Sequence, residues 1–113
     1  MFDCKVVVRV WNMLPVDALS VHWHGLYQRN NYYMDGTSYI TQCPIGPSQK
    51  FTYRFVAEPA GTHWYHSHHA NQRMDGLFGL YNSSLIMNNE KKNSNNNMES
   101  ALQDIKLMQQ MLF

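Results

Sequence analysis

Four short segments of the chain carry the hydrophobic patterning of β-strands, either as strict alternation of apolar and polar residues or as a β-branched run. They are residues 5–11, 19–26, 51–56 and 62–68. Turn formers such as Pro15 and the Glu58-Pro59-Ala60-Gly61 sequence lie between them. Several short strands separated by turns favour an all-β sandwich or barrel.

Side chains of a strand alternate between its two faces, so the pattern also predicts which residues share a face. In residues 19–26, the apolar Leu19, Val21 and Trp23 should lie on one face and His22 and His24 on the other. In residues 62–68, His66 and His68 should likewise share a face. His63 and His69 have the opposite parity and are not expected to point the same way.

The pattern changes after residue 87. Residues 88–97 contain six asparagines and favour a disordered linker. In residues 98–113, apolar side chains recur at helical spacing, which predicts an amphipathic C-terminal helix. Sixteen residues make a marginal helix in water unless it docks on something. The expected organisation is a domain over residues 1–87, a linker over 88–97 and a helix over 98–113.

Composition narrows the function classes. The chain has 113 residues, which favours a single domain, and its net charge is only +1 with 15% charged residues. The chain therefore lacks the strong excess of positive charge that is typical of nucleic-acid-binding domains. Its apolar runs are shorter than the roughly 18–20 residues that span a bilayer. The first residues, Met1 to Lys5, do not form a secretory signal.

The two His-X-His pairs are the strongest chemical signal. Within each pair the Cβ atoms should lie roughly 6.5–7 Å apart, from the rise of about 3.3 Å per residue. If the two strands are neighbours, His22, His24, His66 and His68 surround one volume. Neutral imidazole suits copper, zinc, iron and nickel, and the spacing does not separate copper from zinc. The alternative is a polar seam of stacked rings without a metal.

Five motifs occur in an order and spacing that identify a family. They are HWHG at 22–25, MDG at 34–36, TQCPI at 41–45, GTHWYHSH at 61–68 and QRMDGL at 72–77. Over about residues 4–87 the chain resembles the first cupredoxin domain of the multicopper oxidases, and most of all the laccases. The resemblance implies an all-β, Greek-key cupredoxin-like (plastocyanin-like) β-sandwich, here incomplete.

The same resemblance implies roles for individual residues. His22 would bind the type 2 copper of a trinuclear cluster, His24 and His66 one type 3 copper, and His68 the other. Asp35 matches an acidic residue that assists proton delivery during oxygen reduction, and a carboxylate suits such a relay. The alternative reading of Asp35 is a turn residue in Asp-Gly. Cys43 matches a cysteine that in laccases commonly pairs with one in a later domain, while the state of Cys4 stays open.

By resemblance, the whole enzyme reduces O₂ to water while it oxidises a phenol, an aromatic amine or a metal ion, and it is extracellular. A second cupredoxin domain would supply the remaining cluster ligands and the type 1 copper. Neither cysteine of this chain lies in a His-Cys-His sequence. We therefore expect half of the cluster and no laccase turnover from the isolated chain, and enzymatic activity of the chain itself stays open. The alternatives are a non-catalytic copper-binding or assembly module and a mononuclear zinc site.

Overall fold

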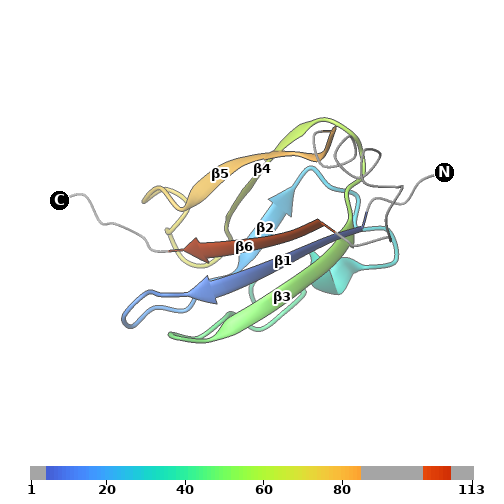
Figure 1. Ribbon diagram of the computed structural model, residues 1–113. Helices are drawn as coiled ribbons and strands as arrows, with labels where there is room; N and C mark the ends of the chain where they lie inside the picture. The colour runs from blue at the N-terminus through green and yellow to red at the C-terminus, as the bar shows by residue number, and fades with distance from the viewer. Residues whose placement is uncertain (1–4, 85–100, 108–113) are drawn as a thin grey trace.

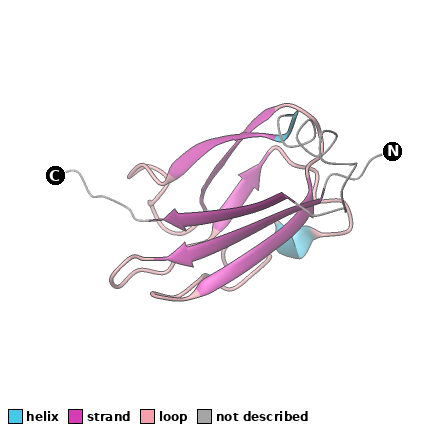
Figure 2. Ribbon diagram, in the orientation of Figure 1, coloured by secondary structure: helices cyan, strands magenta, loops and turns pink. Residues whose placement is uncertain are grey.

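The computed structural model describes residues 5–84 and 101–107. Six strands form two three-stranded sheets (Figures 1 and 2). One sheet has the order β3-β1-β6, with bounds Lys50–Val56, Lys5–Asn12 and Ala101–Leu107. The other has the order β2-β4-β5, with bounds Val21–His24, Thr62–Ser67 and Phe78–Asn82. A 3₁₀ turn, η1, spans Tyr32–Met34. The fold is therefore all-β and forms a partial sandwich, as the sequence predicts.

The core lies between the sheets, where β1, β2 and β3 bury apolar side chains on one face of each strand. β1 contributes Val6, Val8 and Val10, all fully buried. From the other sheet, the Trp23 side chain is 1% exposed and its ring contacts those of Tyr53, Phe55, Tyr65 and Tyr81 at centroid distances of 5.1–6.0 Å. Leu19, Val21 and Trp23 share this inner face, which confirms the predicted alternation.

The C-terminal helix predicted over 98–113 is wrong where the structure describes it. Residues 101–107 form β6, which pairs in parallel with β1, Val8 opposite Gln103. The backbone explains the difference. β3 occupies one edge of β1, and the other edge would leave N–H and C=O groups without partners. A strand satisfies these groups, whereas a short helix would gain little in water. The Asn-rich segment 88–97 lies outside the described residues, and the domain boundary at residue 87 stays a prediction.

A buried tyrosine joins the two sheets through a polar contact. The Tyr53 hydroxyl on β3 accepts a hydrogen bond from the Val21 N–H at 3.1 Å, and the side chain is fully buried. Burial raises the pKa of Tyr53 from 10.0 to about 12, and the contact with Val21 opposes this rise only in part. The phenol therefore stays neutral in the folded chain at pH values where an unfolded tyrosine ionises.

This pKa difference predicts alkaline sensitivity. Below pH 10 Tyr53 is protonated in both states, so its contribution to stability is complete. As pH rises towards 12, the unfolded chain releases the proton first, and stability falls by about 2–3 kcal/mol in total. We expect the Tm of the wild-type chain to fall more steeply over this range than that of Tyr53→Phe, whatever their Tm values at neutral pH. The exposed Tyr32, changed to Phe, should leave the slope unchanged. Parallel slopes for all three proteins would contradict the prediction.

Candidate metal centre

The histidine pairs meet because β2 and β4 are neighbouring antiparallel strands. His22 lies directly opposite His66 in the register, and Val21 lies opposite Ser67. Since Val21 and Trp23 face the core, the intervening His22 and the following His24 project from the other face of the sheet. His66 has the matching parity on β4. Pairing of two alternating strands is thus sufficient to bring imidazoles from distant parts of the sequence together.

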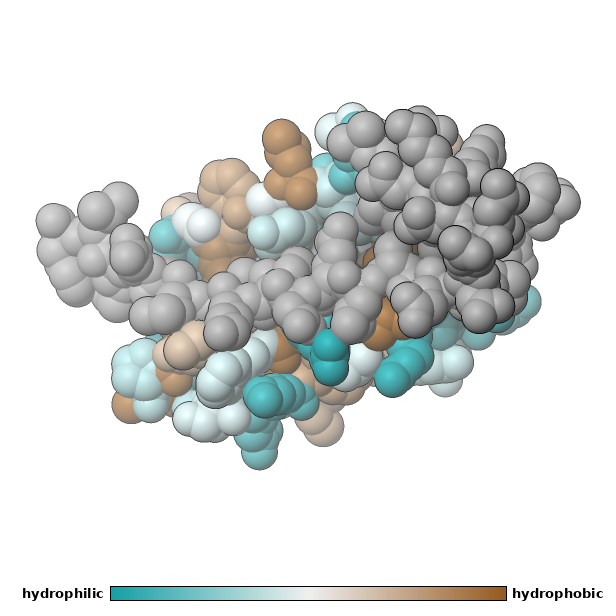
Figure 3. All heavy atoms as spheres, in the orientation of Figure 1, coloured by the Kyte–Doolittle hydropathy of each residue, from teal (hydrophilic) through white to brown (hydrophobic). Residues whose placement is uncertain are grey.

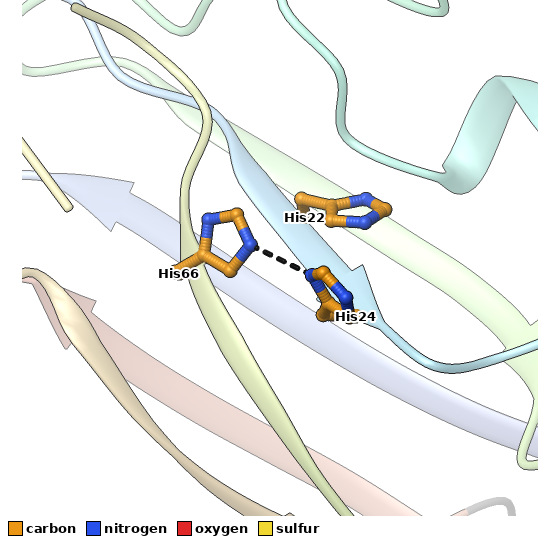
Figure 4. Close-up of side chains that lie close together, drawn as sticks. All are labelled: His22, His24 and His66. Atoms are coloured by element: carbon orange, nitrogen blue, oxygen red, sulfur yellow. Dashed lines mark hydrogen bonds between the residues drawn. The ribbon is translucent and has the colours of Figure 1, made fainter. Parts of the chain in front are cut away.

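Three of the four predicted ligands form one cluster (Figure 4). Each of His22, His24 and His66 offers one ring nitrogen, and these nitrogens all lie within 4.8 Å of one another. The three rings differ in burial: His66 is 2% exposed, His22 is half-buried and His24 is exposed. The cluster therefore has a buried side on β4 and an accessible side at the end of β2.

Burial and a backbone contact determine the protonation state and the tautomer of the His66 ring. Burial lowers the pKa of His66 below its ordinary value, although the contact with the Ser67 carbonyl opposes this. The neutral ring places Nδ1 2.9 Å from that carbonyl oxygen, so Nδ1–H donates and Nε2 carries the lone pair. His66 Nε2 lies 3.1 Å from His24 Nδ1. Only one proton, or one cation, fits between these two nitrogens.

The loop after η1 orients His22. His22 Nδ1 donates to the Asp35 main-chain oxygen at 2.7 Å, while the Asp35 carboxylate Oδ1 is farther away, at 3.4 Å. This contact leaves His22 Nε2 free to bind a metal. Gly36 makes the approach possible. Its φ is +82°, and a Cβ atom there would lie 1.7 Å from the Val21 carbonyl oxygen. Only glycine lets the loop pack this closely on β2.

Trp64 is a site residue that the sequence analysis did not assign. Its ring stacks on His24 at a centroid distance of 5.0 Å with an interplanar angle of 29°, and it lies 4.3 Å from His66. The register places Trp64 opposite His24. Its parity on the strand, the same as that of His66, was the available signal. The stacked indole restricts the rotation of His24, which is otherwise exposed.

The remaining histidines occupy different places. His68 lies just beyond β4 and is exposed. Its ring centroid is 5.7 Å from that of His22 and 6.1 Å from that of His66, so it borders the three-histidine cluster without belonging to it. His63 has its Nε2 2.9 Å from the Pro59 carbonyl oxygen, and His69 contacts the Tyr39 ring. Neither His63 nor His69 belongs to the cluster, as their parity predicts.

Copper fits these donors chemically. The cluster consists of imidazole nitrogens, which are favoured ligands of first-row transition metals, and copper(II) binds such sites most tightly. Two rings already use Nδ1–H on backbone carbonyls, the arrangement that typically orients metal-binding histidines. The third, His24, is exposed and held by Trp64.

Among the described residues, no helix is long and apolar enough to cross a membrane.

A family model described as multicopper oxidase matches residues 3–89. Over 74 residues the chain is 49% identical to an L-ascorbate oxidase of Cucumis sativus and 51% identical to Laccase-1 of Botryotinia fuckeliana. Each alignment covers 66% of this chain but only 13% of the relative. The chain thus spans about an eighth of the length of these curated relatives.

Solved structures agree with the fold. The laccase of Botrytis aclada matches with a TM-score of 0.66 and 43% identity, over 67% of this chain and 14% of that one. A blue copper oxidase of Nitrosomonas europaea matches with a TM-score of 0.62 and 42% identity, over 67% and 24%. These matches confirm the cupredoxin-like sandwich predicted from the motifs. With its fold, its histidine pairs and the family match in agreement, this chain belongs to the multicopper oxidase family, on its laccase-like side.

Proposed function

We propose that this copper oxidase domain contributes His22, His24, His66 and His68 to a trinuclear copper cluster. His22 would serve the type 2 copper, His24 and His66 one type 3 copper, and His68 the other. The observation that carries the proposal is the convergence of three ring nitrogens within 4.8 Å from two paired strands. The position of His68 at the border of this cluster suits a ligand of a separate ion.

Copper bound there would supply the one-electron redox chemistry with which O₂ is reduced to water. The chain's own residues prepare the donors. The Ser67 and Asp35 carbonyls each accept an Nδ1–H, which leaves the His22 Nε2 lone pair free and directs that of His66 towards His24 Nδ1. Burial keeps His66 neutral, and only the neutral ring binds a metal. Trp64 limits the rotation of His24, so the His24 side chain loses less conformational entropy when an ion binds.

We assign Asp35 a role in proton delivery. Its carboxylate Oδ1 lies 3.4 Å from His22 Nδ1, and Oδ2 lies 3.4 Å from the Thr37 hydroxyl. The half-buried carboxylate can hold a proton at either oxygen next to a cluster histidine. Because the main-chain oxygen of Asp35 orients His22, replacing the carboxylate by an amide should impair proton supply without releasing the ring.

A second cupredoxin domain would complete the cluster. His24 is exposed, so the site opens at the surface. Beside it, Trp64 lines a shallow pocket with Met74 and Phe78, and Leu80 follows on β5; the latter three are 80%, 58% and 82% exposed. Apolar side chains stand out from the sheet of β4 and β5 in the space-filling view (Figure 3). An apolar rim around half of a ligand set is what a docking domain would cover.

In the complete assembly, the reductant would be a phenol, an aromatic amine or a metal ion, and the protein would be secreted. This chain contains no His-Cys-His sequence, the motif that in this family supplies further ligands. We therefore infer that it binds copper but does not by itself couple substrate oxidation to O₂ reduction. In the alternative, the chain is a non-catalytic copper-binding or assembly module. Association with a cupredoxin domain and a change in copper content would occur in both cases, but only the first yields O₂ reduction in the complex.

Copper loading tests the proposal. The purified chain, incubated with copper(II) and desalted, should retain copper with a paramagnetic resonance signal of nitrogen-ligated type 2 copper. It should consume no O₂ with a phenol or diamine as reductant. In a competition with equimolar zinc, copper should prevail, because its affinity for such sites is higher. Failure to retain copper, or exclusive retention of zinc, would refute the copper assignment, and four-electron O₂ consumption would refute the inferred inactivity.

A further inference from the structure

A second pocket, which none of the cluster histidines lines, lies where β1 begins and β3 ends; Figure 1 shows these strand ends at its right side. Its volume is about 820 Å³, within the range of small-molecule sites. Val6, Val7, Phe55 and Val56 supply an apolar wall, and the loop of residues 28–31 and Glu58 close the other sides. Nothing in the copper chemistry uses these residues.

The charged side chains around this pocket are mostly cationic. Among the described residues, Lys5, Arg29 and Arg54 line it together with one carboxylate, that of Glu58. Glu58 already faces Arg29, with the Arg29 Nε 3.4 Å from its Oε2. The described lining therefore carries two positive charges in excess, although the whole chain has a net charge of only +1. This local positive charge attracts anions.

Gln28, which also lines this pocket, is buried and incompletely hydrogen bonded. Its side chain is 9% exposed, and its Nε2 has no acceptor among the residues that the structure describes. Its Oε1 accepts a hydrogen bond from Asn31 Nδ2 at 3.3 Å, and the same Nδ2 donates to the Arg54 carbonyl at 2.8 Å. These contacts fix the amide so that the unused group is the N–H donor. Gln28 holds a φ of +46°, a conformation that side chains rarely adopt and that often marks functional sites.

We propose that this pocket binds a small organic carboxylate with an apolar body. The apolar wall would contact the body, and the carboxylate would face Arg54 and Lys5. The excess of positively charged side chains in the described lining favours an anion over a neutral amide. The proposal does not depend on copper binding.

Calorimetric titration of the full chain with benzoate tests the proposal, with benzamide as the uncharged counterpart of the same shape. Benzoate should bind saturably and benzamide at least about tenfold more weakly, since a hydrogen bond to a charged group is worth about 1.5–3 kcal/mol. Arg54→Gln should weaken benzoate binding about tenfold by the same reasoning. Lys50→Gln removes a positive charge from the opposite end of β3 and should leave the affinity unchanged.

Far-ultraviolet circular dichroism should be the same in the wild type and both variants, which shows that the variants fold. The comparison of benzoate with benzamide on the wild-type chain decides even if a variant fails to fold. Absence of saturable benzoate binding, equal affinity for benzamide, or equal weakening by Lys50→Gln would each overturn the proposal. Since the copper-retention assay uses other residues, its failure would leave this result unaffected, and the reverse also holds.

Discussion

Replacing Gly36 by alanine is expected to destabilise the chain by about 3 kcal/mol or more, because a steric overlap adds to the cost of a left-handed backbone. The added Cβ would lie 1.7 Å from the Val21 oxygen and 2.4 Å from its carbonyl carbon. These are backbone atoms of β2 and cannot move aside as a flexible side chain could. The loop must therefore withdraw from β2, and the Asp35 carbonyl must leave His22. Chemical denaturation and copper retention should both report the loss.

Gly76→Ala is the matched control for this prediction. Gly76 also has a positive φ, +104°, but a Cβ atom there would meet nothing within 4 Å. Gly76→Ala should lower the free energy of unfolding only by the cost of a left-handed backbone, about 1–2 kcal/mol, and should retain copper. If Gly36→Ala is no more destabilising than Gly76→Ala, the close approach of the loop to β2 is not what constrains this position.

Replacing His66 by alanine should weaken copper binding by more than about 100-fold, because losing even an indirect partner of a metal ligand costs about 10–100-fold. His66 contributes a neutral ring from the buried side of the cluster, with Nε2 3.1 Å from His24 Nδ1. Two donors, His22 and His24, would remain in the cluster. A competitive chelator titration followed by paramagnetic resonance would measure the affinity and detect the change in nitrogen ligation.

His69→Ala controls for the loss of an imidazole as such. His69 lies three residues further along, has the opposite parity and contacts Tyr39 rather than the cluster. Copper affinity should stay within about threefold of the wild type, the usual scatter of such effects when no ligand is lost. Equal affinity for His66→Ala and His69→Ala would show that copper binds outside the three-histidine cluster.

Much of the site follows from strand periodicity. Alternation alone predicts that His22 and His24 project from the face of their strand that Trp23 does not occupy, because side chains of a strand have a period of two. It likewise predicts that His66 and Tyr65 project from different faces. The burial of Trp23 and the exposure of His24 agree with this. The same argument sets His63 and His69 apart. These inferences succeed because they depend on neighbouring residues within one strand, where the backbone geometry is nearly invariant.

Local patterns were insufficient where a distant partner decided the outcome. Residues 101–107 carry apolar residues at helical spacing, yet they form β6, because the open edge of β1 offers backbone partners that a helix would leave unused. The role of Gly36 was equally hidden. In the sequence it is the second residue of an Asp-Gly turn, and only the packing of that turn on Val21 shows why no side chain is tolerated.

Local patterns were enough to predict the all-β class, the faces of the strands, the histidine pairs and the resemblance to the multicopper oxidases, since each depends on strand periodicity or motif spacing. Tertiary structure alone decided that β2 pairs with β4 in the register that opposes His22 and His66. It also decided that three rings rather than four converge, that Trp64 stacks on His24, and that β6 completes β1. These features depend on contacts between residues tens of positions apart, whose geometry no local pattern specifies.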